Sequence, residues 1–503
     1  MECRLTNRIS SYKIYSDIWG VVTCCRINSP GVMPGSAIRS DVISDRITRP
    51  FVQTVLLFQN CLDKRSFFYH WRSFMKWFVL ATAVLMYVLV IAFPKGKAQF
   101  SVGAAVILLV AGLFLPGGIT PLQAVTQIIN WNVLMIYLGS MIIAALFIYS
   151  RVPARIADVI VDASPNVGVA IIAILAMTGI ISIFVENVAT VLVMAPIALA
   201  LCKKLKMNPT YFMIGLAVMS NLEGTATLVG DPPSMIFASY AGYTFNDFFF
   251  YNGRMSIFFI IQTGMLAGCV FFYMYFARHG SGKIEVKREP VISVFPAVLL
   301  IVMILGLASV SFIHTTFAYT SGCVVMFLAV IGLQWYRQCQ KKTGEEMLTM
   351  LKELDWETII FLIGIFVVVG AISATGLLED FAGFLAAATG GNIVIGYLLI
   401  LVVSIIISGF VDNVPYIIVM LPVAQMLAQH LHLNPELYMF ALLIGSCLGG
   451  NLTPFGASAN IVAMGILKKE GYPMNFAGWL KVGVPFTLIT TGASAVVLWL
   501  LWA

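Results

Sequence analysis

Residues 410–422 read Phe410-Val-Asp-Asn-Val-Pro-Tyr-Ile-Ile-Val-Met-Leu-Pro422, and the chain carries a second version of this stretch upstream. Residues 184–196 read Phe184-Val-Glu-Asn-Val-Ala-Thr-Val-Leu-Val-Met-Ala-Pro196. Both versions place an acid–asparagine pair between two apolar runs, and 226 positions separate the versions (412 − 186). This pattern predicts, in each version, two apolar limbs that are joined at a polar tip.

The same offset continues along the chain beyond the polar tips. It places Asn208-Pro209 on Asn434-Pro435, Gly224 on Gly450 and Gly230 on Gly456. Upstream, Trp131 and Trp356 pair at an offset of 225 (356 − 131). A register that is maintained over this distance indicates an internal duplication, which is typical of secondary transporters.

The composition is that of a membrane protein. Of the 503 residues, 60% are hydrophobic and 11% are charged, and the mean hydropathy is +0.94. A soluble domain carries about 25% charged residues, and several runs here reach the ~17–25 apolar residues that cross a bilayer as a helix. We therefore expect an all-α polytopic membrane protein in contact with the lipid bilayer, and no nucleic-acid partner.

The sequence divides into four predicted segments. Residues 1–76 hold eleven Lys and Arg against five Asp and Glu, which is +6 of the net charge of +7. Because this region lacks the apolar residues for a core, we interpret residues 1–74 as a disordered extension or as a misassigned start ahead of Met75. The first half spans 75–290 with repeat 1 at 131–276, linking spans and a charged cytoplasmic linker occupy 291–355, and repeat 2 occupies 356–503.

Charge predicts the orientation of the loops. If the limb pairs are re-entrant hairpins, the loops on one side hold most of the Lys and Arg, with Lys95 and Lys97 in the first of them. The positive-inside rule assigns that side to the cytoplasm. The resulting topology has about ten spans plus two re-entrant hairpins, both termini outside, and two inverted repeats. We expect the plasma (inner) membrane of a bacterium.

Four breaks in the apolar runs predict the binding site. Two are the tips Glu186-Asn187 and Asp412-Asn413, and the other two interrupt later helices. Inverted-repeat transporters bind substrate and coupling ions near the midplane, where helices break and expose backbone groups. The further candidate residues in the two interrupted helices are Gly224, Thr225, Thr227, Gly230 and Asp231, and Gly450, Asn451, Thr453, Gly456, Ser458 and Asn460.

The two tip acids carry the main functional hypothesis. An ionisable group at membrane depth costs about 2.5–3.5 kcal/mol or more, so a functional role is its default interpretation. Glu186 and Asp412 could carry a proton, or bind Na⁺ together with Asn187 and Asn413. The alternative is that each carboxylate only caps the N-terminus of the second limb. For Asp231, a plain Gly-Asp-Pro-Pro turn is an equal alternative. We expect no cofactor or metal beyond such a coupling ion.

These motifs resemble those of the ion transporter superfamily. The resemblance rests on residues 410–422 quoted above and on Gly-Thr-Ala-Thr-Leu-Val-Gly-Asp-Pro-Pro (224–233), Leu-Gly-Gly-Asn-Leu-Thr-Pro-Phe-Gly-Ala-Ser-Ala-Asn (448–460) and Trp-Glu-Thr-Ile-Ile-Phe (356–361). The chain is most similar to the branch of arsenite permeases, NhaD-type sodium–proton antiporters and melanosomal P-proteins, with citrate transporters as more distant relatives. The resemblance implies a scaffold domain, a transport domain with two hairpins, elevator-like movement and a homodimer.

We predict a secondary active permease for a small ion, coupled to H⁺ or Na⁺, and not an enzyme. The sodium–dicarboxylate relatives carry Ser-Asn-Thr at the tips, whereas Glu186 and Asp412 place a carboxylate there, which would repel a dianion. The open substrate hypotheses are Na⁺/H⁺ antiport, efflux of arsenite-like anions, and citrate or dicarboxylate symport with a compensating cation. The alternative from another class is a channel, or the membrane subunit of an ATP-driven pump with an ATPase partner, because the chain itself has no Gly-x-x-x-x-Gly-Lys-Ser/Thr phosphate loop.

Overall fold

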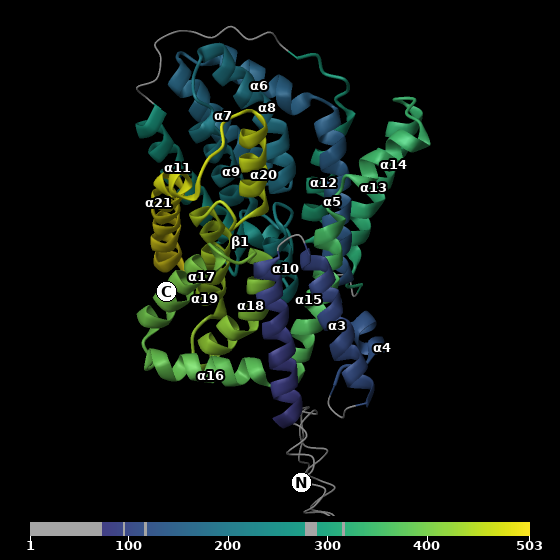
Figure 1. Cartoon of the computed structure of the whole chain (residues 1–503), viewed down its shortest axis with the longest axis vertical. Helices are drawn as coiled ribbons and strands as arrows, with labels where there is room; N and C mark the ends of the chain where they lie inside the picture. The colour runs from purple at the N-terminus through teal and green to yellow at the C-terminus, as the bar shows by residue number, and fades with distance from the viewer. Residues whose placement is uncertain (1–72, 94–95, 115–117, 277–288, 314–316) are drawn as a thin grey trace, which may run out of the picture. The chain divides into compact units, whose positions relative to one another are not determined.

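The computed structural model describes residues 73–93, 96–114, 118–276, 289–313 and 317–503 (Figure 1). All of them belong to one compact unit, residues 71–503. The first described helix is Ser73–Ala92. The prediction for the N-terminal extension concerns residues that, apart from Ser73 and Phe74, lie outside the described part.

The described residues form helices in almost every segment. In the first half these are α3 (Lys97–Phe114), α4 (Pro121–Gln123), the π-helical turn η2 (Ala124–Ile128), α5 (Trp131–Tyr149), α6 (Val152–Ala163), α7 (Val167–Ser182), α8 (Asn187–Leu205), α9 (Thr210–Gly224), α10 (Pro232–Ala241), the 3₁₀ turn η3 (Asn246–Phe248) and α11 (Ile257–Phe276). The linking segment forms α12 (Phe295–Val310), α13 (Thr320–Gln338) and α14 (Gly344–Lys352). The second half forms α15 (Trp356–Ala374), α16 (Leu377–Thr389), α17 (Ile393–Ser408), α18 (Asn413–His430), α19 (Pro435–Gly449), the 3₁₀ turn η4 (Gly450–Leu452), α20 (Ser458–Lys469) and α21 (Phe476–Trp502).

One small β-hairpin interrupts this helical pattern between η3 and α11. Strands β1 (Phe250–Tyr251) and β2 (Arg254–Met255) pair antiparallel. The two residues between them, Asn252 and Gly253, have φ values of 50° and 75°, and Asn-Gly with positive φ at both positions is typical of a tight hairpin turn. Our all-α expectation did not include this hairpin.

The order of elements in the first half recurs in the second. In each, a long helix (α5, α15) leads to a short amphipathic helix (α6, α16), a pair of limbs (α7–α8, α17–α18), an interrupted helix (α9–α10, α19–α20) and a final long helix (α11, α21). Trp131 and Trp356 stand at the first position of α5 and α15, and each indole N–H donates at 2.7 Å to a carbonyl in the preceding turn. Figure 1 shows α6 at one end of the described helices and α16 at the other.

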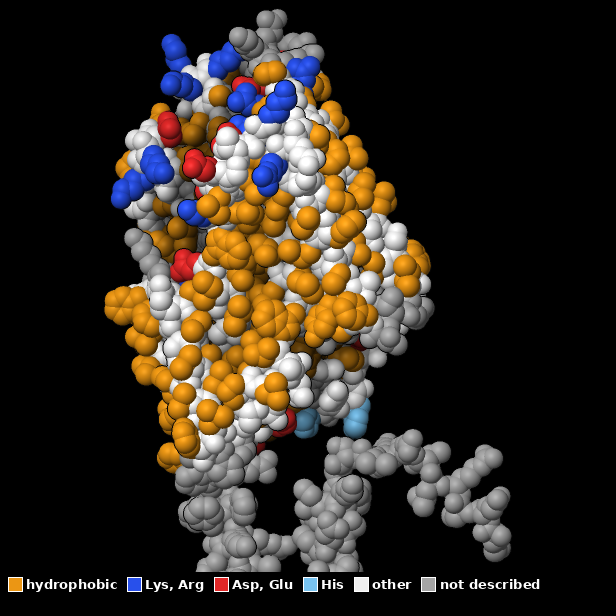
Figure 2. Space-filling model, turned by 90° about the vertical axis from the view of Figure 1, so that its right-hand side faces the viewer, with side chains coloured by type: hydrophobic (Ala, Val, Ile, Leu, Met, Phe, Trp, Pro, Cys, Tyr) orange, Lys and Arg blue, Asp and Glu red, His pale blue; other side chains and the backbone are white. Residues whose placement is uncertain are grey.

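The helices identify a multi-pass membrane protein. Within the described residues, seven helices are long and apolar enough to cross a bilayer, and three shorter apolar helices accompany them. Figure 2 shows a broad apolar belt, with Lys and Arg side chains gathered at the end where α6 lies in Figure 1. This confirms the polytopic class, while the count of ten spans and the inversion of the repeats stay predictions.

The helices pack as two groups. The framework group consists of α3, α5, α12, α13 and α15, in which α5 packs along α13 and α3 along α15. The hairpin group consists of both limb pairs, the interrupted helices α9–α10 and α19–α20, and the final helices α11 and α21. The groups meet where α8 and α10 lie against α5 and where α18 lies against α15, so the two polar tips face the framework group.

The contact between α3 and α15 predicts a sensitive glycine. A Cβ at Gly364 on α15 would lie 2.6 Å from the carbonyl carbon of Ser101 on α3, so Gly364→Ala must push two backbones apart. Overpacking of this kind typically costs about 1–3 kcal/mol, and we expect a clear fall in the melting temperature of the detergent-solubilised protein.

Gly103 offers the matched control because it lies on α3 itself and a Cβ there meets nothing within 4 Å. Gly103→Ala should leave the melting temperature unchanged or raise it slightly, since alanine favours helix by about 1 kcal/mol over glycine. Equal melting of the two variants would contradict the predicted packing.

Candidate functional site

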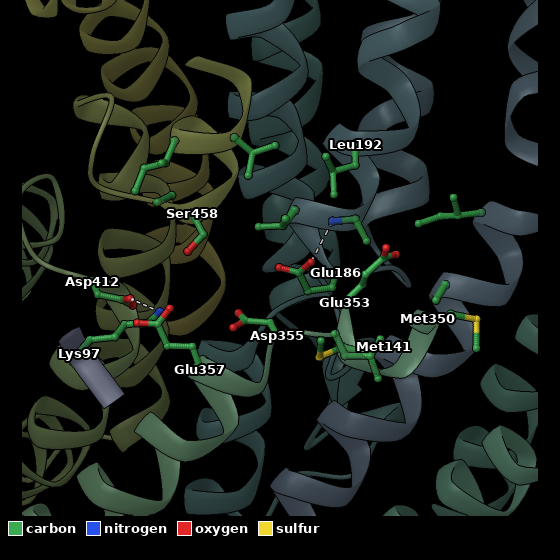
Figure 3. Close-up of a pocket in the computed structure, with 18 of the residues that line it drawn as sticks. Lys97, Met141, Glu186, Leu192, Met350, Glu353, Asp355, Glu357, Asp412 and Ser458 are labelled. Carbon is green, nitrogen blue, oxygen red and sulfur yellow. Dashed lines mark hydrogen bonds and ion pairs between the residues drawn. The ribbon is translucent and has the colours of Figure 1, made fainter. Parts of the chain in front are cut away.

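A cavity of about 1420 Å³ lies between the framework group and the hairpin group. Its lining from the framework side includes Lys97, Met141, Asp355 and Glu357, and its lining from the hairpin side includes Glu186, Leu192, Asp412 and Ser458 (Figure 3). Both tip acids therefore reach the same cavity, although 226 residues of chain separate them (412 − 186).

Each tip acid also caps a helix. Glu186 precedes α8 and its Oε2 accepts from the backbone N–H of Ala189 at 2.9 Å. Asp412 precedes α18 and its Oδ1 accepts from the backbone N–H of Val414 at 3.1 Å. The capping role that we considered as an alternative is thus present at both tips, but it is combined with a position on the cavity wall.

The asparagine beside each acid is not part of the cavity lining and is held by a serine of the first limb. In the first half, Ser182 donates to Asn187 Oδ1 at 2.7 Å. In the second half, Ser408 is hydrogen-bonded to Asn413. With its amide nitrogen turned toward them, Asn413 also donates to the carbonyl oxygens of Gly456 at 3.2 Å and Ser446 at 3.1 Å. Asn187 and Asn413 therefore fix the tips to the interrupted helices.

The first interrupted helix closes tightly around its tip. Thr227 donates to the carbonyl of Ile183 in the turn before the tip. A Cβ at Gly224 would lie 2.2 Å from Asn187 Oδ1, and one at Gly230 would lie 2.3 Å from the Gly224 carbonyl oxygen. These positions require glycine because the backbone itself makes the contact.

The second interrupted helix repeats these contacts at the same offset. Thr453 donates to the carbonyl of Gly409. A Cβ at Gly450 would lie 3.2 Å from the Asn413 amide, and one at Gly456 would lie 2.5 Å from the Gly450 carbonyl oxygen. The 226-residue offset in the sequence thus corresponds to equivalent hydrogen bonds and equivalent glycine contacts in the structure.

A cluster of buried amides connects the two halves. Asn221 on α9 donates through Nδ2 to Asn451 Oδ1 at 2.8 Å and to Asn460 Oδ1 at 2.9 Å. Asn460 in turn donates to the carbonyls of Gly450 and Thr453 at 2.9 Å each. Asn451 and Asn460 were predicted from the sequence but Asn221 was not, and its counterpart position in the second half holds Cys447.

The candidate residues therefore fall into two sets. Glu186, Asp412, Gly456 and Ser458 line the cavity. The others lie outside its lining and hold the tips and broken helices together, and Thr225, Thr227, Asn451, Thr453 and Asn460 are buried. Asp231 is also buried, and it caps α10 by accepting from the Ser234 N–H at 3.0 Å. Asp231 is therefore a helix cap, and its role in a binding site stays a prediction.

The position of Lys97 differs from our expectation for the charged loops. We placed it in a cytoplasmic loop, but it is the first residue of α3 and its ammonium lies 3.5 Å from Asp412 Oδ2. The same nitrogen donates to Thr358 at 3.2 Å and lies 5.6 Å from the centre of the Phe361 ring. The side chain is only 15% exposed. In the sequence, the Pro94-Lys-Gly-Lys97 segment between two apolar runs is typical of a loop, which concealed this contact.

The cavity is strongly acidic. Among its described lining residues Lys97 is the one lysine or arginine, against seven acids, which are Glu186, Glu345, Glu346, Glu353, Asp355, Glu357 and Asp412. Five of these acids were not predicted as site residues. They lie in α14, in α15 and in the turn between them, away from the four breaks in the apolar runs. Lys342 donates to Glu346 at 2.6 Å and lowers the pKa of that carboxyl, so Glu346 remains ionised at neutral pH.

Comparisons with known proteins agree with this architecture. A family model described as citrate transporter matches residues 85–445. An uncharacterized transporter of Mycobacterium tuberculosis is 32% identical over 376 residues, which covers 74% of this chain and 86% of the relative. The P protein of Mus musculus is 25% identical over 392 residues, covering 62% of this chain and 47% of that protein.

Among solved structures, the YdaH transporter of Alcanivorax borkumensis superposes with a TM-score of 0.55 at 13% identity, covering 82% of this chain and 97% of that one, which is a likeness of fold. Together these matches confirm the resemblance on which our sequence analysis relied. The chain belongs to the citrate transporter family and is a multi-pass membrane transporter.

Proposed function

We propose that this chain is a secondary active transporter that binds a small cation, H⁺ or Na⁺, at Glu186 and Asp412. The observation that carries the proposal is the cavity lining, in which both tip acids stand among seven acidic residues and one lysine. A cavity whose charged lining residues are mostly of one sign concentrates counter-ions, and carboxylate oxygens are preferred ligands of hard cations. This balance favours Na⁺/H⁺ antiport over the efflux of arsenite-like anions.

The position of the cavity supports an elevator-type mechanism. Lys97 and Asp355 belong to the framework group, whereas Glu186 and Asp412 belong to the hairpin group. A site that is shared between two packed groups opens and closes when one group slides along the other. We propose that the hairpin group is the transport domain, and that residues 131–276 and 356–503 are inverted repeats whose exchange of roles gives alternating access.

Citrate or dicarboxylate symport is a second candidate, which the family match favours. An anion with several negative charges would be repelled by Glu186 and Asp412 unless cations entered with it. In this version of the proposal, the acidic lining binds the accompanying cations, and the anion lies against the hydroxyl group of Ser458 and the ammonium group of Lys97.

Oligomeric state, membrane and cofactor complete the proposal. We propose a homodimer in the plasma membrane that uses no cofactor beyond its coupling ion. The resemblance supports the dimer, and the bacterial relatives support the membrane. A pump subunit would require an ATPase partner. If an ATPase copurified with the chain, the pump alternative would replace secondary transport.

Neutralising the tip acids tests the proposed cation site. In everted vesicles that carry a ΔpH, added Na⁺ should dissipate the gradient with the native chain. Glu186→Gln and Asp412→Asn should each slow this by about tenfold or more, because the loss of one charged partner costs about 1.5–3 kcal/mol. Glu379→Gln on the exposed face of α16 is the control and should behave like the native chain.

Two results of this assay would change the assignment. A response to citrate with its cations, but not to Na⁺ alone, would replace antiport by the symport alternative. Native rates in both tip variants would remove Glu186 and Asp412 from the site while the fold assignment stands.

The Lys97–Asp412 pair generates a separate prediction. Lys97 is a tethered cation that competes for Asp412, so Lys97→Met should raise the apparent affinity for the transported cation. At 3.5 Å two unit charges interact by about 1–5 kcal/mol at surface-like dielectric constants, so we expect a change of about tenfold or more. The measurement is the Na⁺ concentration that gives half-maximal dissipation of ΔpH.

The control for this measurement is Lys76→Met. It breaks the exposed pair with Asp380, and such surface pairs contribute about 0–1 kcal/mol. An unchanged half-maximal concentration in Lys97→Met would show that the ammonium does not compete for the site.

A further inference from the structure

Glu223 is a fully buried acid that the cavity does not use. It lies in the last turn of α9, next to Gly224, and its exposed fraction is 0%. It is absent from the cavity lining. Glu223 was not among the acids predicted from the sequence, and its counterpart in the second half is Gly449 (223 + 226). The two halves therefore differ at this point.

The surroundings of Glu223 leave its carboxyl group incompletely paired. Gln262 on α11 donates through Nε2 to Glu223 Oε2 at 2.7 Å. The other oxygen, Oε1, is buried and has no hydrogen-bond partner among the described residues. On the opposite side lies α7, where a Cβ at Gly179 would be 2.9 Å from Glu223 Cγ. The carboxyl group is thus enclosed between α7, α9 and α11.

No positive charge compensates this acid within the described part of the chain, because none of the ion pairs found there involves Glu223. Helix α7 has no titratable side chain, and on α11 the titratable group within electrostatic range is the thiol of Cys269. The lysines of α8 stand in its last turn, at the opposite end from Asn187 and Gly224. Among the described ion pairs, none joins a lysine of α20 or α21 to Glu223.

A buried carboxylate with one amide donor and no counter-ion is costly, and such a group normally binds a proton and becomes neutral. The geometry does not suit Na⁺, because Gln262 presents its N–H to the carboxylate rather than its oxygen. We propose that Glu223 is a proton-binding site, separate from the cavity, that carries its proton at neutral pH.

The position of this proton site connects it to both tips. Gly224, the next residue, contacts Asn187 of the first tip. Asn221, two residues earlier, donates to Asn451 and Asn460 of the second half. Loss of the proton would place a full negative charge in the turn that holds these contacts. A consequence for transport rests on the proposed function, whereas proton binding at Glu223 does not.

The experiment is an infrared difference titration of the purified full-length protein in lipid nanodiscs, from acidic to alkaline pH in H₂O and D₂O. The native protein should show the C=O band of a buried protonated carboxyl group at neutral pH. Glu223→Gln should remove the component of this band that Glu223 contributes, while Glu186→Gln and Asp412→Asn retain that component. Glu470→Gln, at an exposed position, is the matched control and should also retain it.

A band of undiminished intensity in Glu223→Gln, or a diminished band in Glu470→Gln, would overturn the proposal. If Glu223→Gln fails to fold, Glu223→Asp keeps a titratable carboxyl group, and its band should remain at a shifted frequency. Because the titration needs no transport, it separates this proposal from the proposed function. In vesicles, Glu223→Gln should still transport but with a flatter dependence on pH, and an unchanged profile would overturn the link to transport.

Discussion

A helix that breaks inside a membrane exposes backbone groups that lipid cannot bind, so the protein must supply every partner itself. In the first half, Thr227 binds the carbonyl of Ile183 before the tip, and Asn187 lies so close to Gly224 that no side chain fits between them. The limb pair and the interrupted helix therefore depend on each other for their backbone partners. The second half makes the equivalent contacts with the same residue types at the same offset. This explains why the two halves are most similar in sequence at these positions.

The two halves are also joined to each other by hydrogen bonds of buried side-chain amides. Asn221 donates to two asparagines of the second half, and Asn451 donates back to the carbonyl of Val218 on α9. A buried polar network of this kind is costly when it is only partly satisfied. If the hairpin group moves as we propose, it should move as one body, because separating its halves would leave buried amide groups unpaired.

The sequence predicted those features that depend on local patterns. The apolar runs gave the helices, Gly224–Pro233 marked the break between α9 and α10, and the acid–asparagine tips marked both starts of the second limbs. Contacts between distant segments were not predictable in this way. Lys97 looked like a loop residue because its partner Asp412 is 315 residues away (412 − 97). Glu223 was missed because one acid in a buried helix has no spacing pattern, and only packing shows that it lacks a second partner.

The structure also shows that the two tip acids, although they are mates by sequence, are not equivalent. Asp412 has the ammonium of Lys97 beside it, whereas Glu186 forms no ion pair with a described lysine or arginine. Lys97 belongs to the framework group and Asp412 to the hairpin group, so any sliding between the groups changes this pair and leaves the cap at Glu186 intact. A residue that lies outside both halves thus adds a further difference between them. If the proposed sliding occurs, the charge that Asp412 meets differs between the two positions, and a cation at Asp412 would then bind with a different affinity in each position.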